Sequence, residues 1–365
     1  MKVGILTFMD TMNYGAELQM YGMFKSLIEM GHQVEVIDYS CSIINERENP
    51  YNRRISSPRQ FIWRLLVKHN AETKWNNFRY FERGKIAFTE HQDIKSIGKK
   101  LKEFDAVIVG SDQIWNPDNV GNDNVYLLPF DLTEVKKISY AASFGFNADN
   151  QRLSEYLKNK KELFLDFDSL SVREEEGQQI IKKYLNLDSE VVLDPTFLIT
   201  KEDWSELENQ GDSILDSYID KPFILVYGLN KDSRMKVLKK AKEMRKRNGL
   251  DILWLGSNIP VSGVKTIPSL GPSGFIKAFD NASYVLTNSY HGTCFALIFK
   301  KQFQCIMESN NKNNTNSRMI GLLQRMNISA ALDDLLPDNY DWSNFDNAMK
   351  TERNKSVQYL RNAIG

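Results

Sequence analysis

The residues best suited to chemistry in this sequence are polar side chains that directly follow predicted strands. His291 and Gly292 stand in the segment NSYHGT, where an apolar strand over 284–287 turns into a helix. The start of a helix offers free backbone N–H groups and the positive end of the helix dipole. An imidazole there suits an anionic ligand, as a proton donor or as a cation. We interpret the other histidines, at 32, 69 and 91, as structural.

Further cations are expected at the same kind of junction. Arg173 follows a predicted strand over 169–172 and precedes three glutamates, 174–176. Its guanidinium matches a carboxylate or a phosphate with two parallel hydrogen bonds, and the alternative is a pair with those glutamates. Lys312 and Arg318 follow a predicted strand over 303–307. Together these cations predict a site for a small, highly charged anion.

Acidic and hydroxyl side chains follow the strands of the first half. Ser111 and Asp112 belong to the segment GSDQIWN after a strand over 105–109, and Ser143 to AASFG after a strand over 137–140. A carboxylate in this position can act as a base, accept a hydroxyl hydrogen bond or cap a helix. The small neighbouring residues let a ligand approach the backbone.

The first loop of the chain offers another such junction. Asn13, Gly15 and Glu17 open a helix directly after a strand over 2–8. Free N–H groups and a glycine favour ligand binding, whereas the alternative is an ordinary turn between strand and helix. No Gly-x-Gly-x-x-Gly or Walker A pattern occurs, which disfavours dinucleotide and P-loop sites. No Gly-x-Ser-x-Gly elbow and no metal-ligand spacing is found either, so we expect no hydrolase triad and no metal.

The strands that must position these residues alternate with helices. Short apolar strands separated by helices predict parallel sheets that are covered on both faces. In such sheets a ligand binds beyond the carboxyl ends of the strands, where the residues above stand. We expect an α/β protein with two Rossmann-like domains. The second series of strands begins after Lys221-Pro222, and the predicted divisions are a domain over 1–215, a second domain over 216–343 and a carboxy-terminal helix over 344–365 that packs back on the first domain.

Composition limits the class of protein. The 365 residues are 42% hydrophobic and 26% charged, and 47 basic residues balance 47 acidic ones. These values exclude a disordered chain and give no global basic field for nucleic acid. No apolar run approaches the roughly 18 residues of a membrane-spanning helix. Three well-separated cysteines and a strand directly at the amino terminus predict a reduced, cytoplasmic protein.

One stretch departs from this scheme. Residues 52–85 carry nine basic residues against two acidic ones, among six aromatic side chains that include Trp63 and Trp75. We expect a helical arm inserted into the first domain. Basic and aromatic residues together suit the face of an anionic membrane, such as the inner face of the cell membrane. The alternative is an arm that packs on its own domain or on a second subunit.

Ten segments of the sequence, taken in order, resemble the polysaccharide pyruvyl transferase family. They run from about residue 3 to 325: KVGILTF, NYGAELQMYG, GHQVEVIDY, DAVIVGSDQIWN, KISYAASFG, SVREEEG, VVLDPTFLI, ILVYGL, YVLTNSYHGTCFALIFKKQF and NSRMIGLL. Each segment alone is a weak signal, but their common order is specific. The resemblance implies a fold similar to the GT-B glycosyltransferases, with a solvent-filled cleft between the domains.

The resemblance also implies an activity. It implies transfer of the enolpyruvyl group of phosphoenolpyruvate onto two hydroxyls of a cell-surface polysaccharide precursor, a glycan or a lipid-linked saccharide, in exopolysaccharide or capsule synthesis, without a cofactor. By motif, the donor-binding Arg, His and Lys of the family fall on Arg173, His291 and Lys312, with Gly292 beside the histidine and Arg318 as a substitute for the lysine. The acceptor loops would hold Asn13, Gly15, Ser111 and Ser143.

One position departs from the family. Many members have an acid after the first-loop glycine, where this chain has Ala16. The base would then come from Glu17, Asp10 or Asp112, and His291 is either the acid or a cation. Two alternatives remain: a nucleotide-sugar glycosyltransferase of the same fold, and a carbohydrate-binding relative without catalysis. The acceptor sugar, the ketal positions and the oligomeric state, including a homo-oligomer, stay open at this stage.

Overall fold

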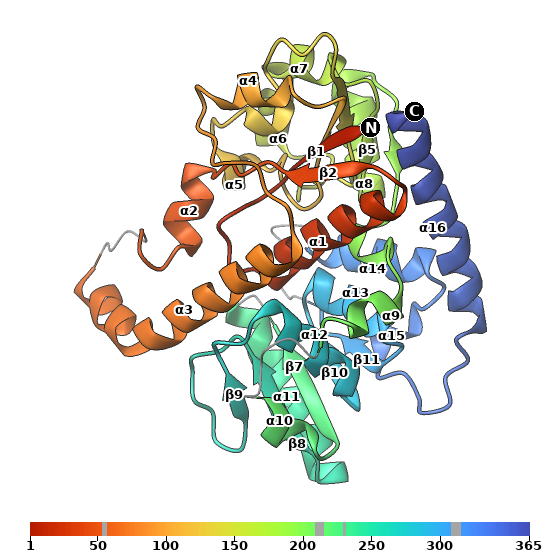
Figure 1. Ribbon diagram of the computed structural model, residues 1–365. Helices are drawn as coiled ribbons and strands as arrows, with labels where there is room; N and C mark the ends of the chain where they lie inside the picture. The colour runs from red at the N-terminus through yellow and green to blue at the C-terminus, as the bar shows by residue number, and fades with distance from the viewer. Residues whose placement is uncertain (53–56, 209–214, 229–230, 308–314) are drawn as a thin grey trace. The chain divides into compact units, whose positions relative to one another are not determined.

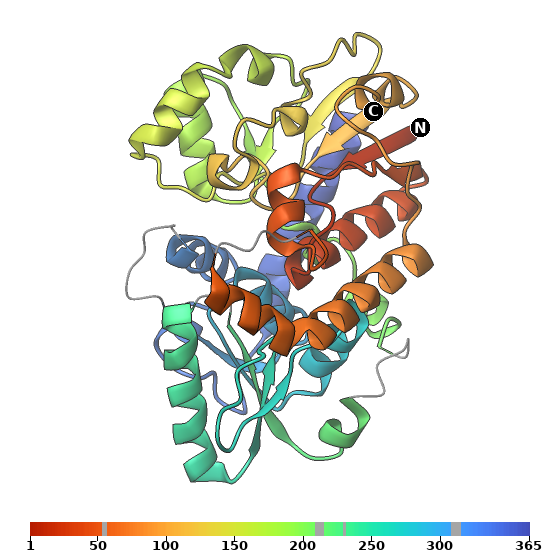
Figure 2. The same cartoon turned by 90° about the vertical axis from the view of Figure 1, so that its left-hand side faces the viewer.

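The computed structural model describes residues 1–52, 57–208, 215–228, 231–307 and 315–365. The chain divides into two compact units, and neither is a continuous stretch of sequence. Unit 1 contains Met1–Arg53, Lys85–Ile199 and Lys350–Gly365, and unit 2 contains Arg54–Gly84 and Thr200–Met349. Figures 1 and 2 show the course of the chain through both units from two directions.

Unit 1 is built on a parallel sheet. Its four central strands have the order β2-β1-β3-β4, and single bridges from β4 and the segment after it continue the sheet to the pair β5-β6. The strands are β1 (Lys2–Leu6), β2 (Gln33–Val36), β3 (Ala106–Val109), β4 (Lys136–Ser139), β5 (Ser171–Val172) and β6 (Glu190–Val191). All four residues of β3 are buried, as expected of a central parallel strand that is covered on both faces.

Helices connect the strands of unit 1. The longest is α1 (Tyr14–Glu29), which links β1 to β2. The others are α2 (Ser42–Glu48), α4 (Ile97–Leu101), α5 (Pro117–Val120), α6 (Gln151–Lys158), α7 (Lys161–Leu165) and α8 (Glu175–Ile180), with short 3-10 turns at Val125–Leu127 and Pro195–Phe197 and a π-helical turn at Ile181–Leu185. The pattern of β1, α1 and β2 that the sequence predicted is confirmed within a few residues at each end.

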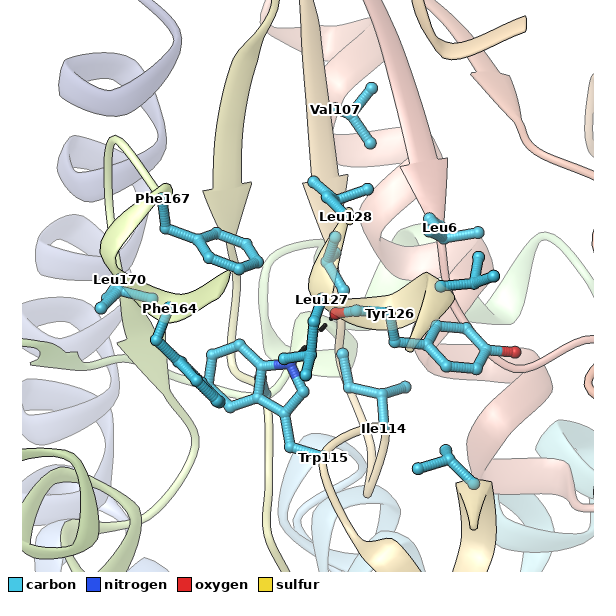
Figure 3. Close-up of a cluster of buried hydrophobic side chains, with 14 of the residues drawn as sticks. Leu6, Val107, Ile114, Trp115, Tyr126, Leu127, Leu128, Phe164, Phe167 and Leu170 are labelled. Carbon is cyan, nitrogen blue, oxygen red and sulfur yellow. Dashed lines mark hydrogen bonds between the residues drawn. The ribbon is translucent and has the colours of Figure 1, made fainter. Parts of the chain in front are cut away.

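The core of unit 1 fixes the loop that follows β3. The Trp115 indole is fully buried, and its Nε1 donates a hydrogen bond to the Tyr126 carbonyl at 3.1 Å. Its ring meets the rings of Phe164 at 4.8 Å and Phe144 at 5.3 Å. Figure 3 shows Trp115 and Phe164 together with residues of β1 and β3. Buried aromatic packing of this kind stabilises a loop by several kcal/mol, so the residues just before Trp115 have a firm support.

Unit 2 has a second parallel sheet, with the order β11-β10-β7-β8-β9. Its strands are β7 (Phe223–Tyr227), β8 (Asp251–Leu255), β9 (Lys265–Ile267), β10 (Tyr284–Thr287) and β11 (Gln302–Cys305). Its helices are α3 (Pro58–Lys85), α9 (Lys201–Ser205), α10 (Asp216–Ile219), α11 (Lys231–Asn248), α12 (Pro272–Asn281), α13 (Tyr290–Ile298), α14 (Thr315–Arg325) and α15 (Ala330–Asp333). The expected α/β fold with parallel sheets is therefore confirmed. The sequence prediction had omitted β9 and α12.

The basic arm differs from the prediction, which placed it in the first domain. Nearly all of α3 belongs to unit 2. The Asn70 side chain donates to Asn258 Oδ1 and the Asn77 side chain to the Ser269 carbonyl, both at 2.9 Å. These contacts join residues almost 200 positions apart, which no local sequence pattern reveals.

The boundary expected near residue 215 also differs, since the chain enters unit 2 at Thr200. The reason is Trp204 of α9, which is fully buried and meets the ring of Phe295 of α13 at 5.1 Å. At the other end, α16 (Ser343–Ile364) begins in unit 2 and continues into unit 1 from Lys350 on. There the Tyr359 hydroxyl donates to the Ser139 carbonyl at 2.8 Å.

Candidate functional site

The two loops at the carboxyl ends of β1 and β3 form the centre of the candidate site in unit 1. The sheet order places β2 on one side of β1 and β3 on the other, so the chain changes direction between these strands. Such a switch point opens the crevice in which α/β proteins bind their ligands. The residues that the sequence predicted here are Asn13, Gly15 and Glu17 after β1 and Ser111 and Asp112 after β3.

Gln19 of α1 joins these two loops. Its amide nitrogen donates to Thr7 Oγ1 at 3.0 Å, and its amide oxygen accepts from the Ser111 N–H at 3.1 Å. The Ser111 hydroxyl in turn donates to the Ala141 carbonyl after β4, at 3.0 Å. Three strand ends are thereby held together by buried polar contacts, which specify geometry because each group has a partner. Sequence reasoning missed Gln19.

Asp112 has a backbone conformation that only its surroundings can maintain. Its φ is 67°, in the left-handed region, and its carbonyl accepts the Ser143 N–H at 2.9 Å. Two residues earlier, Gly110 has a φ of 130°, and a Cβ there would lie 2.1 Å from the Tyr140 carbonyl oxygen. Only glycine fits this position. Strained residues of this kind gather at functional sites, and here they direct Asp112 toward Arg173.

Arg173 lies among three carboxylates. Its Nη1 is 2.9 Å from Asp194 Oδ2, its Nε is 3.5 Å from Glu174 Oε2, and its Nη2 is 3.6 Å from Asp112 Oδ1. The guanidinium is 1% exposed. The sequence had expected Arg173 in a solvent-filled cleft, and this part of the expectation is wrong, because the carboxylates and the strand ends enclose the side chain. The alternative partner, the adjacent glutamate, is one of the three.

Each of the other two carboxylates is itself held in place. The Ser143 hydroxyl donates a hydrogen bond to Glu174. Asp194 is fully buried, and its Oδ1 accepts the N–H and the hydroxyl of Thr196 at 3.0 and 2.9 Å. Sequence reasoning missed Glu174 and Asp194 as site residues. The available signal was the position of both directly after predicted strands, the same rule that singled out Asp112.

The first loop is used mainly for capping. Asn13 Oδ1 accepts the Gly15 N–H at 2.9 Å and caps α1, as the ordinary-turn alternative predicted. Glu17 lies in the first turn of α1 and is buried. Asp10 has a φ of 54°, and its carboxylate accepts hydrogen bonds from the Ser40 hydroxyl and from Asn45. Asp10 is thus occupied by its neighbours within unit 1, which makes Asp112 the better candidate for a base.

His291 stands at the corresponding switch point of unit 2. The sheet order places β8 on one side of β7 and β10 on the other, and α13 begins just after β10. His291 is in the first turn of α13 and is 6% exposed. Its ring meets the Tyr290 ring edge-on at 5.4 Å. A buried imidazole at a helix start is well placed to contact an anion.

The residues beside His291 shape the turn. A Cβ on Gly292 would lie 2.3 Å from Thr287 Oγ1, and that hydroxyl already donates to the Tyr227 carbonyl at 2.7 Å. Ser289 caps α13 by accepting the Gly292 N–H at 3.3 Å. Gly292 is therefore required by packing, and its N–H caps the helix. This accounts for the glycine that the sequence assigned to donor binding.

Arg318 lies in the first turns of α14, and α14 packs against α13. Arg318 is 7% exposed. The starts of two adjoining helices thus carry His291 and Arg318. Lys312 lies outside the described residues. Among the described residues, no three His, Cys, Asp or Glu side chains are grouped as a metal site would require, and no helix is long and apolar enough to cross a membrane.

The two units thus define a class of protein: α/β units with parallel sheets, each with polar side chains at its switch point. Comparison with known proteins gives the family. The sequence profile named polysaccharide pyruvyl transferase matches residues 13–310. The chain belongs to the polysaccharide pyruvyl transferase family. No curated protein sequence matches it significantly.

Solved structures confirm the GT-B type of fold. The UDP-GlcNAc 2-epimerase from Methanocaldococcus jannaschii has a TM-score of 0.54 at 13% identity, with 99% of this chain and 100% of that chain covered. The UDP-GlcNAc 2-epimerase from Neisseria meningitidis, bound to UDP-GlcNAc, has a TM-score of 0.54 at 11% identity, with the same coverage. Anabaena HepE, in complex with UDP and glucose, has a TM-score of 0.50 at 10% identity, covering 99% and 98%. These identities are low and establish the fold alone.

Proposed function

We propose that this protein transfers the enolpyruvyl group of phosphoenolpyruvate onto two hydroxyls of a saccharide, forming a pyruvate ketal and releasing phosphate. Family membership supports a transferase of this kind. The observation that carries the proposal is the different chemistry of the two switch points. Carboxylates outnumber cations around Arg173 in unit 1, whereas His291 and Arg318 occupy helix starts in unit 2.

The reaction needs groups of both kinds. One hydroxyl adds to C2 of phosphoenolpyruvate while C3 takes up a proton and becomes a methyl group. The second hydroxyl then displaces the phosphate, and its proton leaves with the products. A base must accept a hydroxyl proton, and cations must stabilise the departing phosphate. Neither the addition of the first hydroxyl nor the displacement of phosphate requires a redox cofactor or a metal.

In this proposal Asp112 accepts the proton of the attacking hydroxyl. Ser143 and Ser111 belong to the acceptor side, since they stand at the ends of the neighbouring strands and are fixed by backbone contacts. Arg173 acts as a positioning residue that holds Asp112, Glu174 and Asp194 in one arrangement. The alternative, inferred from the family, is that Arg173 binds the donor. Mutation of Arg173 distinguishes this donor-binding role from the positioning role.

His291, Arg318 and Lys312 hold the phosphate of the donor in this proposal. Phosphoenolpyruvate carries about three negative charges at neutral pH, and charge-assisted hydrogen bonds to imidazolium and guanidinium are the strong kind. His291 either protonates C3 or acts only as a cation. A change in turnover after His291→Ala indicates the first role, and a change in donor affinity alone indicates the second.

Phosphate release tests the proposal. Phosphoenolpyruvate is incubated with the protein and with saccharide acceptors of different hydroxyl geometry, with EDTA present. We expect phosphate only when a suitable acceptor is added, and a loss of at least about tenfold in Asp112→Asn. Asp188→Asn is the matched control, since that carboxylate is 95% exposed. Release of UDP from a UDP-sugar, without release of phosphate from phosphoenolpyruvate, would favour a nucleotide-sugar glycosyltransferase. Saccharide binding without release of UDP or phosphate would favour a non-catalytic relative.

A further inference from the structure

Five large apolar side chains are exposed within six residues of α3. Phe61, Ile62, Trp63, Leu65 and Leu66 are 46–72% exposed; they are called the α3 patch below. No other stretch of the described chain gathers exposed hydrophobic residues in this density. Contiguous apolar surface is costly in water and usually marks an interaction site.

The second half of the same helix behaves differently. Phe78 and Phe81 are buried, and Trp75 is 8% exposed with the Arg79 guanidinium 4.5 Å above its ring. The sequence had grouped Trp75 with Trp63 as a membrane-facing residue, and the burial of Trp75 contradicts that. Asn70 and Asn77 tie this half to unit 2 by hydrogen bonds. The helix is therefore anchored without the α3 patch, whose side chains are left for another partner.

An open groove borders the α3 patch. Its volume is about 710 Å³, and it is lined by Arg59, Ile62, Trp63 and Leu66 of α3 and by residues 256–259.

 The lining is mixed, because the helix contributes the aromatic and aliphatic side chains of Ile62, Trp63 and Leu66 together with Arg59. This face of the helix is therefore also incompletely covered by protein, and its apolar side chains can accept further apolar groups.

The charged residues of α3 next to the α3 patch are basic up to Lys68, and the first acidic residue, Glu72, pairs with Lys68 at 3.8 Å. Between Glu48 and Glu72 the sequence has no acidic residue and five basic ones, Arg53, Arg54, Arg59, Arg64 and Lys68. Lys68 is 62% exposed, and Arg59 is exposed as well. Basic side chains next to apolar ones complement a partner with anionic groups at its surface and apolar groups directly beneath them. The chain as a whole has no net charge, so this is a local property.

Two other partners fit less well. A second copy that used the same patch would bring the basic residues of one chain against those of the other, because a two-fold contact is self-complementary. Nucleic acid would use the aromatic rings for stacking, but Ile62, Leu65 and Leu66 gain nothing from a base. An anionic lipid surface satisfies both the aliphatic residues and the cations.

We propose that the first turns of α3, from Pro58 to Lys68, bind an anionic lipid membrane. The α3 patch enters the boundary between headgroups and acyl chains, and the basic side chains contact headgroup phosphates. Trp63 is the kind of residue that prefers this depth. The contact is peripheral. It does not rest on the proposed reaction, because it concerns a surface that contains none of the residues assigned to chemistry.

Co-sedimentation of the full chain with vesicles tests this proposal. Vesicles of phosphatidylcholine with phosphatidylglycerol are compared with vesicles of phosphatidylcholine alone. We expect binding to the anionic vesicles that weakens with salt. The triple variant Phe61→Ser, Leu65→Ser and Leu66→Ser removes apolar surface and is expected to lose about 100-fold or more in partitioning. Arg59→Gln with Lys68→Gln removes two charges and is expected to lose roughly 30-fold.

Matched controls lie elsewhere on the surface. Met235→Ser removes an apolar side chain that is 57% exposed, and Lys236→Gln with Lys239→Gln removes two exposed charges from the basic helix α11. These controls are expected to bind like the parent. Equal vesicle binding by the triple variant and the parent overturns the proposal. A loss of binding in the α11 charge variant as large as that of Arg59→Gln with Lys68→Gln overturns it as well. The proposal is also overturned if the parent does not bind vesicles and sediments as a dimer, while the triple variant sediments as a monomer.

Discussion

Replacing Arg173 by methionine removes the cation that three carboxylates share. The nitrogen–oxygen distances are 2.9, 3.5 and 3.6 Å. With an effective dielectric constant of about 20, each pair contributes an attraction of about 5 kcal/mol before desolvation is subtracted. Methionine has a similar length but no charge, so the variant leaves Asp112, Glu174 and Asp194 close together without compensation.

The net effect is smaller than the sum of these attractions. Burying the four charged groups costs free energy that the attractions largely offset, and removal of one partner from a buried pair typically costs about 3–5 kcal/mol. We expect Arg173→Met to lose this amount from the free energy of unfolding, which corresponds to roughly 10 °C in melting temperature for a unit of this size. Arg173→Lys keeps the charge but reaches fewer carboxylates, and is expected to lose less.

Urea unfolding of the parent, Arg173→Met, Asp194→Asn and the double variant measures the coupling. We expect the double variant to be more stable than the sum of the single losses predicts, because Asp194→Asn relieves the repulsion that Arg173→Met creates. Lys182→Met is a control, since its ion pair with Asp188 is exposed and such pairs contribute little. Additive losses, or an Arg173→Met variant as stable as the parent, would refute this reasoning.

Three further predictions concern other parts of the molecule. Gly292→Ala places a Cβ 2.3 Å from Thr287 Oγ1, so we expect a loss of about 1–3 kcal/mol in unfolding experiments and weaker donor binding through a displaced His291. All three cysteines are buried and none forms a disulfide, and burial raises the pKa of Cys305 to about 12. A thiol reagent should therefore react slowly with the cysteines of the native protein and rapidly with all three thiols after denaturation. Burial, followed by hydrogen bonding to and repulsion from Asp280, raises the pKa of Glu208 to about 7. The folded state then holds this proton more tightly than the unfolded state, so the stability contribution falls as pH rises from about 5 to 7; melting temperatures should show Glu208→Gln gaining on the parent over this range, by on the order of 1 kcal/mol because the side chain is partly exposed.

The sequence predicted those parts of the fold that depend on local pattern. Strands such as β3 and β7 are short apolar runs between turns, and both were found where expected. The rule that ligands bind beyond the carboxyl ends of parallel strands also brought Ser111, Asp112, Ser143 and Arg173 together from three separate segments. That rule works because register and direction are common to all strands of a parallel sheet.

The parts that the sequence did not predict depend on distant contacts. The partners of Arg173 include Asp194, 21 positions later in the chain, and spacing alone does not show that three carboxylates converge on one guanidinium. Helix α3 belongs to unit 2 through Asn70 and Asn77, although the unit 1 segment Lys85–Ile199 separates α3 from the rest of unit 2 in the sequence. Polar side chains of this kind carry no periodic signal, so their partners become visible only in the folded chain.

The most direct test of the proposed reaction follows the C2 carbon of phosphoenolpyruvate. The protein is incubated with phosphoenolpyruvate labelled at C2 and with an acceptor that supports phosphate release, and the saccharide product is isolated for carbon NMR. The account predicts that the label becomes a ketal carbon bonded to two sugar oxygens and a new methyl group, and that His291→Ala and Asp112→Asn each form at least about tenfold less of this product. Label that remains in phosphoenolpyruvate or appears only as free pyruvate, with an unmodified saccharide, would contradict it.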